Sequence, residues 1–218
     1  MKFDFQEIKE NIRNKSLYKY QNDLNRSDKK IIVLSSDCVG GRLMKDYALP
    51  SYTPMINNHY SAKDFIKICQ NPDYYFSHEV EFAGYSKHNH PMGRIDDVCV
   101  IFGHSSGYEE SLKKWKIGCK NYFRAKKTNN YEIIVICNDR NGFMLEDVNG
   151  FESLPYKYKV NFVHTKEYLS ENSFYMKNED NFNCVKTMTS FESRFSIKRR
   201  YDRYDFYKVF KKAKGLDE

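Results

Sequence analysis

The sequence predicts an α/β fold in which a mainly parallel sheet is flanked by helices in three layers, followed by a basic C-terminal helix. Three short apolar runs, at residues 31–34, 98–102 and 133–137, lack the alternation of half-exposed strands. Continuous apolar strands of this kind are typical of parallel sheets that are covered on both faces. Each run ends in a polar cluster and is followed by a helical pattern, as expected of repeated strand–helix units. A chain of 218 residues is long enough for one substantial core.

The first 29 residues are expected to form a helix and a connector. Apolar residues recur at helical spacing here and predict a helix that packs against the outside of the domain through Phe5, Ile8, Ile12 and Leu17. Residues 21–30 are polar and predict the connector to the first strand.

Helices dominate the stretch between the first two apolar runs. Gly40 and Gly41 open a short helix that must stop near Pro50. Residues 61–64 resemble a capping box and predict the start of another helix. The remaining predictions for this stretch are a short helical turn beginning at Pro72, a strand at 77–82 and an exposed loop at 84–94.

The rest of the chain predicts further α/β elements and then a basic tail. A longer helix at 108–126 follows the second apolar run, and a helix near 143–148 and a strand at 159–163 follow the third. These complete a core domain at residues 30–165. In residues 166–218, a polar irregular segment at 170–188 precedes a basic helix at 191–212, which is expected to pack on or extend the same domain. Its aromatic residues fall near one face: Phe191, Phe195, Tyr204, Tyr207 and Phe210.

Composition indicates a mildly basic protein of a reducing compartment. The formal charge is +7, from 36 Lys and Arg against 29 Asp and Glu. Lys, Asn, Tyr, Phe and Ile share AT-rich codons, so this charge alone does not predict a nucleic-acid partner, although it favours anionic substrates or membrane lipids. The six cysteines are scattered without a Cys-x-x-Cys pair, and the acidic N-terminus and short apolar runs fit neither a signal peptide nor a membrane span. We therefore expect a cytoplasmic protein whose only contact with the membrane is peripheral, at its inner face.

Cys38 lies between a predicted strand and a predicted helix start. Backbone N–H groups and the helix dipole stabilise a thiolate at such a place. This position favours a nucleophile with a lowered pKa, or an anion-binding turn in which Gly40 and Gly41 let the backbone approach a ligand and Arg42 contributes charge. The alternative is a small apolar cysteine packed under a tight glycine turn.

His104 follows the second apolar run directly. Its imidazole is expected to face Cys38 across a crevice as a general base, with Ser105 or Ser106 nearby as a hydroxyl donor. A histidine that only caps the next helix is the alternative.

The third run ends in Asn138, Asp139 and Arg140. Asp139 is expected to orient His104 or to act as a base, and Arg140 suits bidentate capture of a phosphate or carboxylate. The alternative is that this string simply makes a good turn. Because ligands bind beyond the carboxyl ends of parallel strands, we expect Cys38, His104 and Asp139 to be the catalytic residues of one crevice. The expected substrate-binding residues are Gly40, Gly41, Arg42, Ser105, Ser106, Asn138 and Arg140.

Other motifs are weak or missing. His88 and His90 are close in sequence, but no third ligand stands at a recognised spacing, so no metal site is expected. The chain contains no Walker loop, no dinucleotide-binding Gly-x-Gly-x-x-Gly and no Gly-x-Ser-x-Gly elbow.

Several short motifs occur along the chain in a specific order and spacing: Cys38-Val39-Gly40-Gly41, Leu49-Pro50, Thr53-Pro54, Asp64-Phe65, Pro91-Met92-Gly93 with Asp97, His104-Ser105-Ser106 with Glu109, Glu110, Lys114 and Trp115, Asp139-Arg140-Asn141-Gly142, Phe151 and Leu154-Pro155-Tyr156-Lys157. Through these motifs, from about residue 30 to 163, the chain resembles a bacterial family of exopolysaccharide or capsular-polysaccharide biosynthesis proteins, known as domain of unknown function 1919. The chain departs from the family at Val39 and Asn141, where an aromatic residue and an acid are usual, and at 117–119, where a basic segment is usual.

The resemblance implies an enzyme of surface-polysaccharide assembly, a transferase acting on a saccharide or nucleotide-sugar substrate. Two mechanisms stay open: acyl transfer from an acyl donor through Cys38 and His104, and glycosyl transfer from a nucleotide-sugar with Asp139 as base and Arg140 on the diphosphate. No other cofactor is expected. The competing class is a non-catalytic module that binds an anionic membrane surface or nucleic acid through the basic C-terminal helix at 198–200.

Overall fold

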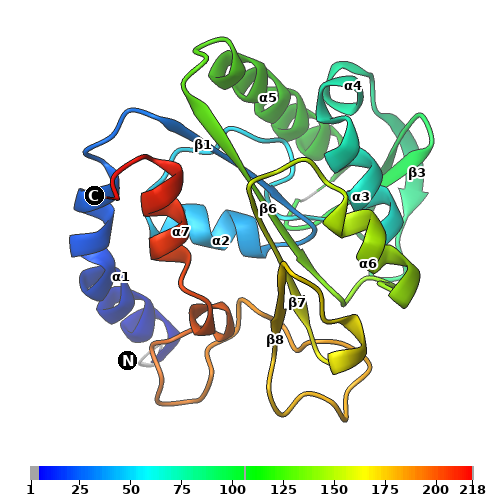
Figure 1. Ribbon diagram of the computed structural model, residues 1–218. Coiled ribbons are helices and arrows are strands. Elements are labelled where there is room, and N and C mark those ends of the chain that lie inside the picture. Colours follow the sequence, from blue (N-terminus) through cyan, green and yellow to red (C-terminus); the bar gives the residue numbers. More distant parts are fainter. Residues whose placement is uncertain (1–4, 106, 218) are drawn as a thin grey trace.

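Two four-stranded sheets form the framework of the protein. Figure 1 shows the computed structural model, which describes residues 5–105 and 107–217. The first sheet is parallel throughout, in the order β1 (Lys30–Ser35), β6 (Tyr131–Asn138), β7 (Tyr158–Val163) and β8 (Ser173–Tyr175). The second sheet is antiparallel, in the order β2 (Asn58–His59), β5 (Val98–Phe102), β4 (Pro91–Ile95) and β3 (Glu81–Tyr85).

The α/β class is confirmed, but the prediction that all three apolar runs share one mainly parallel sheet is wrong. The run at 98–102 is β5, which joins β4 through a tight turn at Asp96 and Asp97 and pairs with it antiparallel. Asp96 takes the left-handed conformation that such turns require, with φ at 52°. A short apolar run is compatible with either kind of sheet, and only the pairing partner decides between them.

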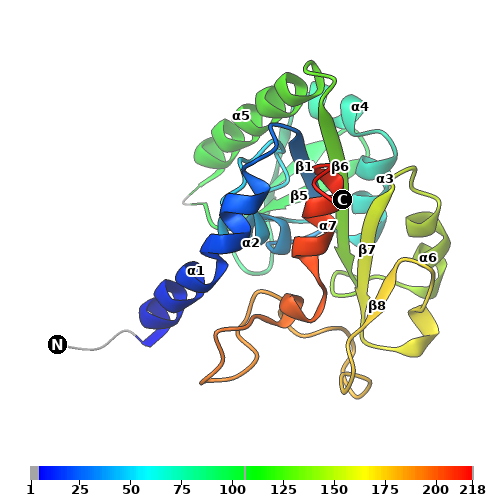
Figure 2. The same ribbon diagram turned by 60° about the vertical axis from the view of Figure 1, so that its left-hand side comes forward.

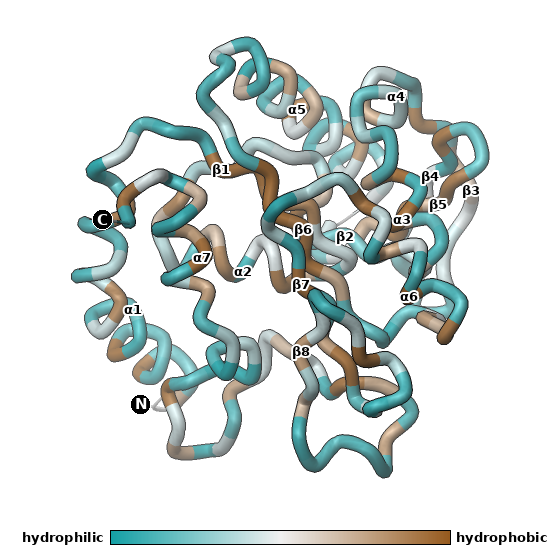
Figure 3. Tube along the Cα trace, in the orientation of Figure 1, coloured by the Kyte–Doolittle hydropathy of each residue, from teal (hydrophilic) through white to brown (hydrophobic). Residues whose placement is uncertain are grey.

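Helices cover both faces of the parallel sheet. Side chains of β1 alternate between the faces: Ile31 and Val33 pack on one side and Ile32 and Leu34 on the other. Figures 1 and 2 show α1 (Phe5–Leu24), α2 (Val39–Asp46) and α7 (Phe206–Ala213) on the first side. The other side holds the antiparallel sheet and α3 (Ala62–Gln70), α4 (Pro72–Ser77), α5 (Tyr108–Lys126) and α6 (Leu145–Glu152). Figure 3 shows hydrophobic residues along the central strands β1 and β6, where these two halves of the core meet.

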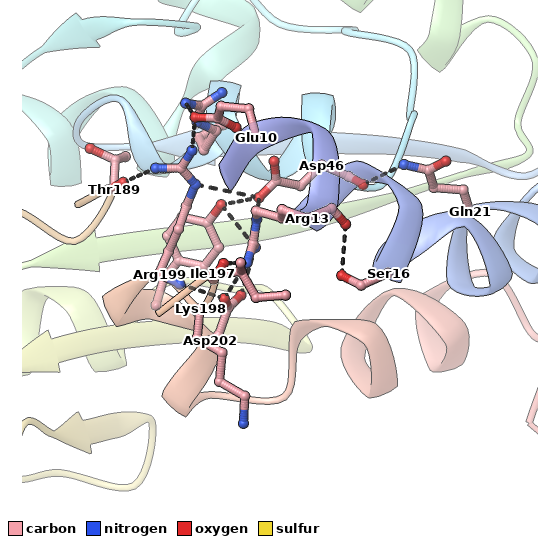
Figure 4. A network of polar contacts seen from close by, with 12 residues as sticks. Glu10, Arg13, Ser16, Gln21, Asp46, Thr189, Ile197, Lys198, Arg199 and Asp202 are labelled. Carbon is pink, nitrogen blue, oxygen red and sulfur yellow. Dashed lines mark hydrogen bonds and ion pairs between the residues drawn. The ribbon is translucent and has the colours of Figure 1, made fainter. Parts of the chain in front are cut away.

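The N-terminal helix forms and packs through Leu17 as predicted, but the three other apolar residues expected to pack do not. Phe5, Ile8 and Ile12 remain 47%, 39% and 48% exposed. The buried residues of α1 are Lys9, Arg13, Leu17 and Leu24. Polar contacts also hold the helix: the guanidinium of Arg13 lies 2.7 Å from Asp46 of α2 and is paired with Asp202 near the C-terminus (Figure 4). The spacing of apolar residues cannot predict such contacts.

Several local predictions also need correction. Residue 77 ends α4, and the strand predicted at 77–82 begins only at Glu81. The predicted loop at 84–94 contains the turn and strand residues of the β3–β4 hairpin. The predicted irregular segment at 170–188 contributes β8 to the edge of the parallel sheet, following the 3₁₀ turn η1 (Lys166–Tyr168).

The prediction of a continuous basic helix at 191–212 is wrong. Only the 3₁₀ turn η2 (Arg200–Arg203) and the short helix α7 form there. The side chains of Arg199 and Arg200 are 4% and 11% exposed and are paired with Glu10 and Glu179. Because these two cations are used inside the fold, the predicted basic helix surface at 198–200 does not exist. Within the described part of the chain, no helix has both the length and the apolar character needed to cross a membrane.

Candidate functional site

A cysteine thiol lies between two histidine side chains at one end of the parallel sheet. Cys38 Sγ is 3.5 Å from His59 Nε2 and 3.4 Å from His104 Nε2. Cys38 follows β1 and caps α2, His104 follows β5, and His59 belongs to the short strand β2. Since β2 pairs with β5, the antiparallel sheet delivers both imidazoles to the carboxyl end of β1. The structure thus brings Cys38 and His104 together, although they come from different sheets.

Two glycines allow residues 57–59 to lie this close to the thiol. A Cβ atom at Gly41 would lie 2.6 Å from Asn57 Oδ1, and one at Gly103 would lie 2.6 Å from the backbone oxygen of Asn57 and 3.3 Å from the His59 ring. The 2.6 Å distances are far below ordinary van der Waals contact; at Gly103 the obstacle is backbone, so a side chain there would push the segment away, whereas at Gly41 it is the end of the Asn57 side chain. Gly40 is equally confined, since its Cβ would meet Ser35 Cβ at 2.6 Å. Gly40 and Gly41 were expected to admit a ligand; their tight contacts here are with the protein's own chain.

The electrostatic surroundings keep the thiol protonated. Burial, with a further contribution from the carboxylate of Asp37, raises the pKa of Cys38 to about 12. The expected lowering of this pKa is therefore wrong, because loss of hydration disfavours the thiolate. Burial also lowers the pKa of His59, while Asp37 opposes that shift and His104 adds to it. A neutral His59 can accept the proton of the neutral Cys38 thiol. The two side chains are therefore arranged for general-base catalysis and do not form a thiolate–imidazolium ion pair in the free protein.

Asp37 links the ends of two parallel strands beneath this pair. Its carboxylate accepts hydrogen bonds from Val39 N and from the side-chain amide of Asn138, each at 2.8 Å. The side-chain Oδ1 of Asn138 in turn accepts a hydrogen bond from the backbone N–H of Arg140 at 3.2 Å. Asn138, predicted to bind substrate, is 2% exposed and positions Asp37 instead.

The carboxylate of Asp139 is engaged elsewhere. It is buried and accepts hydrogen bonds from the Nδ1 and the backbone N–H of His164, at 2.6 and 2.7 Å, and from Val185 N at 2.7 Å. The partner of Asp139 is thus His164 rather than His104. Arg140 donates to Val185 O at 3.3 Å and to Thr187 Oγ1 at 3.0 Å. Both residues fasten the segment near 185 to the ends of β6 and β7.

Two cavities open on either side of His104. One, of about 370 Å³, lies beside the thiol and is lined by Cys38, Gly41, Arg42, Lys45, Asn57, His104 and Thr189. The other, of about 270 Å³, lies against α5; Ser105 and Trp115 are in its wall, and it shares Asn57 and His104 with the first. His104 itself has φ at 57°, which is uncommon for a residue with a side chain and is found disproportionately at functional sites. Ser106, the other expected hydroxyl, lies outside the described residues.

Three participants were missed in the sequence. Asp37 follows the first strand and His164 follows the strand at 159–163, so the rule that selected Cys38 would have selected both. His59 gives no such signal, because its strand has only two residues. In residues 5–105 and 107–217, no group of three or more His, Cys, Asp or Glu side chains is arranged to hold a metal ion.

Residues 8–211 match a family described as domain of unknown function (DUF1919), and the chain belongs to that family. The match extends beyond the resemblance seen in the sequence at both ends. The chain is also similar to an uncharacterized protein of Haemophilus influenzae, with 28% identity over 211 residues that cover 96% of this chain and 98% of the relative.

Proposed function

We propose that this member of the DUF1919 family is a transferase that moves an acyl group onto a saccharide through a thioester at Cys38. The observation that carries the proposal is the thiol of Cys38 held within 3.5 Å of the Nε2 atoms of His59 and His104. A nucleophile within hydrogen-bonding reach of a base is the general arrangement of covalent catalysis.

The two histidines have different surroundings and are given different roles. His59 is the more enclosed, and its lowered pKa keeps it neutral at pH 7, so it accepts the thiol proton as the sulfur attacks the carbonyl carbon of the donor. His104 lines both cavities and is placed to contact the incoming and leaving groups. The proton held by His59 returns to the leaving group, and the thioester remains on Cys38.

The second half of the reaction reverses the proton path. A saccharide hydroxyl attacks the thioester carbon, its proton passes to an imidazole and then to the sulfur of Cys38, and the free thiol is restored. The cavity against α5 suits this acceptor, because its wall combines the indole of Trp115 with the polar side chains of Asn57, Asn58 and Ser105. The choice of a saccharide, and of a role in surface-polysaccharide assembly, rests on the resemblance drawn from the sequence motifs.

The contacts favour acyl transfer over glycosyl transfer. Asp139 was the base required by the glycosyl mechanism, but its carboxylate already accepts three hydrogen bonds from His164 and Val185. Arg140, required for the diphosphate, is hydrogen-bonded to the segment at 185–187.

Acetylation by p-nitrophenyl acetate, in the presence of EDTA, tests the proposal without knowledge of the natural donor. Wild-type protein should release a stoichiometric burst of nitrophenol, and mass spectrometry should place one acetyl group on Cys38. Cys38→Ser and Cys38→Ala should lose the burst, whereas Cys184→Ser, which removes another partly exposed cysteine, should keep it. Acetylation that persists in Cys38→Ala at the wild-type rate would refute the thioester.

One further variant tests the assigned base His59, and a deacetylation assay tests the saccharide acceptor. His59→Gln should slow acetylation by about 10²–10⁴-fold, the usual contribution of general-base catalysis. Acetylated wild-type protein should lose its acetyl group faster when simple sugars are added, and no faster when sodium chloride of equal osmolarity is added. Deacetylation that ignores sugars would remove the saccharide from the proposal.

A further inference from the structure

A third cavity, of about 510 Å³, lies between the N-terminal half of α1 and the segment at 190–199. Its wall includes Lys9 and Glu10 of α1, Arg42 of α2, and Arg194 and Arg199. Figure 4 shows Glu10 and Arg199 facing one another at this place, beside Thr189. Three segments that are distant in sequence thus build one basic wall.

The positive charge of this wall exceeds its negative charge. Among the described residues of the cavity wall, four carry cationic side chains and one, Glu10, carries a carboxylate. Glu10 is shared between Arg42, at 2.7 Å, and Arg199. Asp46 lies 3.8 Å from Arg199 Nε, but it is also paired with Arg13. Glu10 therefore cannot neutralise the cavity.

Lys9 is a buried cation of this wall whose ammonium contacts backbone oxygens and an aromatic ring. Its ammonium donates to the backbone oxygens of Ser193 and Arg194, at 2.9 and 3.3 Å, and lies 3.8 Å from the ring centre of Phe191. Burial and then the nearby charge of Arg199 lower the pKa of Lys9, and the carboxylate of Glu10 opposes this shift only in part. An anion placed in the cavity would relieve this repulsion and receive charge-assisted hydrogen bonds.

Arg42 connects the basic cavity to the thiol. It lines both this cavity and the one beside Cys38, and its backbone N–H donates to Cys38 O at 3.1 Å, one helical turn away. Thr189 and Ser190, consecutive in the chain, line one cavity each. Lys45 adds a further cation to the wall beside the thiol. The two cavities are therefore neighbours along one positively charged path.

We infer that the basic cavity binds the phosphoryl groups of the acyl donor while the acyl carbon of that donor lies at Cys38. The inference rests on the proposed function for the reacting end of the donor. The binding of phosphoryl groups depends only on the cavity. Phosphoryl groups occur in nucleotide-bearing acyl donors and in phospholipids that carry acyl esters, and both present the same oxygens to the site.

Isothermal titration calorimetry of the full chain with inorganic pyrophosphate tests the inference. Wild-type protein should bind one equivalent, more tightly than inorganic phosphate, with an affinity that falls as salt rises. Arg194→Gln and Arg42→Gln should each weaken binding about tenfold or more, since a charge-assisted hydrogen bond contributes roughly 1.5–3 kcal/mol. Arg26→Gln removes the same charge from an exposed side chain outside the cavity and should bind as the wild type does. Equal binding by all four proteins, or no binding by a folded wild type, would overturn the inference.

Further ligands separate the two sources of the phosphoryl groups. Tighter binding of ADP and coenzyme A than of pyrophosphate would assign a nucleotide-bearing donor. Cosedimentation with vesicles containing phosphatidic acid, lost in Arg194→Gln but not in Arg26→Gln, would assign a phospholipid donor. Loss of pyrophosphate binding with intact acetylation of Cys38 overturns this inference alone. Intact binding without acetylation overturns only the proposed function.

Discussion

Replacing Gly103 with alanine tests whether the close packing of residues 57–59 holds His59 at the thiol. A Cβ atom at this position would lie 2.6 Å from the backbone oxygen of Asn57. Ordinary contact begins at 3.4 Å, so the two backbones must separate by about 0.8 Å, the difference between 3.4 and 2.6 Å. The atom in the way is backbone, so no side-chain rotation relieves the clash.

Two consequences follow from this separation. Overpacking costs about 1–3 kcal/mol, which lowers the melting temperature of a chain of this size by roughly 2–12 °C. In addition, His59 Nε2 starts 3.5 Å from Cys38 Sγ, and a displacement of this size breaks the thiol–imidazole hydrogen bond. Acetylation of Cys38 should then fall by about 10²-fold or more, as expected when a general base is lost.

Gly107→Ala is the matched control in the same loop. A Cβ atom there meets nothing within 4 Å, and its φ of 179° is extended backbone that any residue adopts. Thermal unfolding followed by circular dichroism gives the stability, and mass spectrometry of protein quenched after mixing with p-nitrophenyl acetate gives the acetylation rate. The reasoning fails if Gly103→Ala matches Gly107→Ala in both measurements. A stability loss with unchanged acetylation would show that His59 does not serve the thiol.

Three other expectations can be checked directly. Because the pKa of Cys38 is about 12, its alkylation by iodoacetamide should rise about tenfold per pH unit from pH 7 to 10; a plateau below pH 8 would reveal a resting thiolate. Asp139→Asn should lower the free energy of unfolding in urea by about 1–3 kcal/mol, because the NH₂ group of the new amide would face N–H donors that now donate to the carboxylate. Unchanged stability would contradict the role of Asp139 in holding the segment near 185. Gly118→Ala should destabilise by about 1–3 kcal/mol, because its Cβ would lie 2.4 Å from Pro54 Cα. Gly150→Ala, whose Cβ would make only ordinary contacts at 3.5 Å, should instead stabilise its helix by about 0.5–1 kcal/mol. Equal effects of the two substitutions would argue against the close approach of α5 to Pro54.

The sequence alone determined the parts of the site that depend on local pattern. Short apolar runs formed β1, β5 and β6, and Cys38 and His104 lie beyond two of these strand ends. Such signals are local, because burial of a strand demands apolar residues along its own length whatever its partners are. Asp37 and His164 also follow strand ends, so the same local pattern identifies them. It does not specify which side chains beyond the strand ends contact one another.

Tertiary structure decided the pairings and the charge states. His59 reaches the thiol only through the pairing of a two-residue strand with β5. The carboxylate of Asp139 accepts hydrogen bonds from the backbone N–H groups of His164 and Val185, which are 25 and 46 positions away. The buried face of α1 includes Arg13, which pairs with Asp202 at a separation of 189 positions, whereas Phe5, Ile8 and Ile12 stay exposed. The pKa of the Cys38 thiol follows from its burial once these elements are assembled, since loss of hydration depends on neighbours that are distant in the chain and close only in the fold.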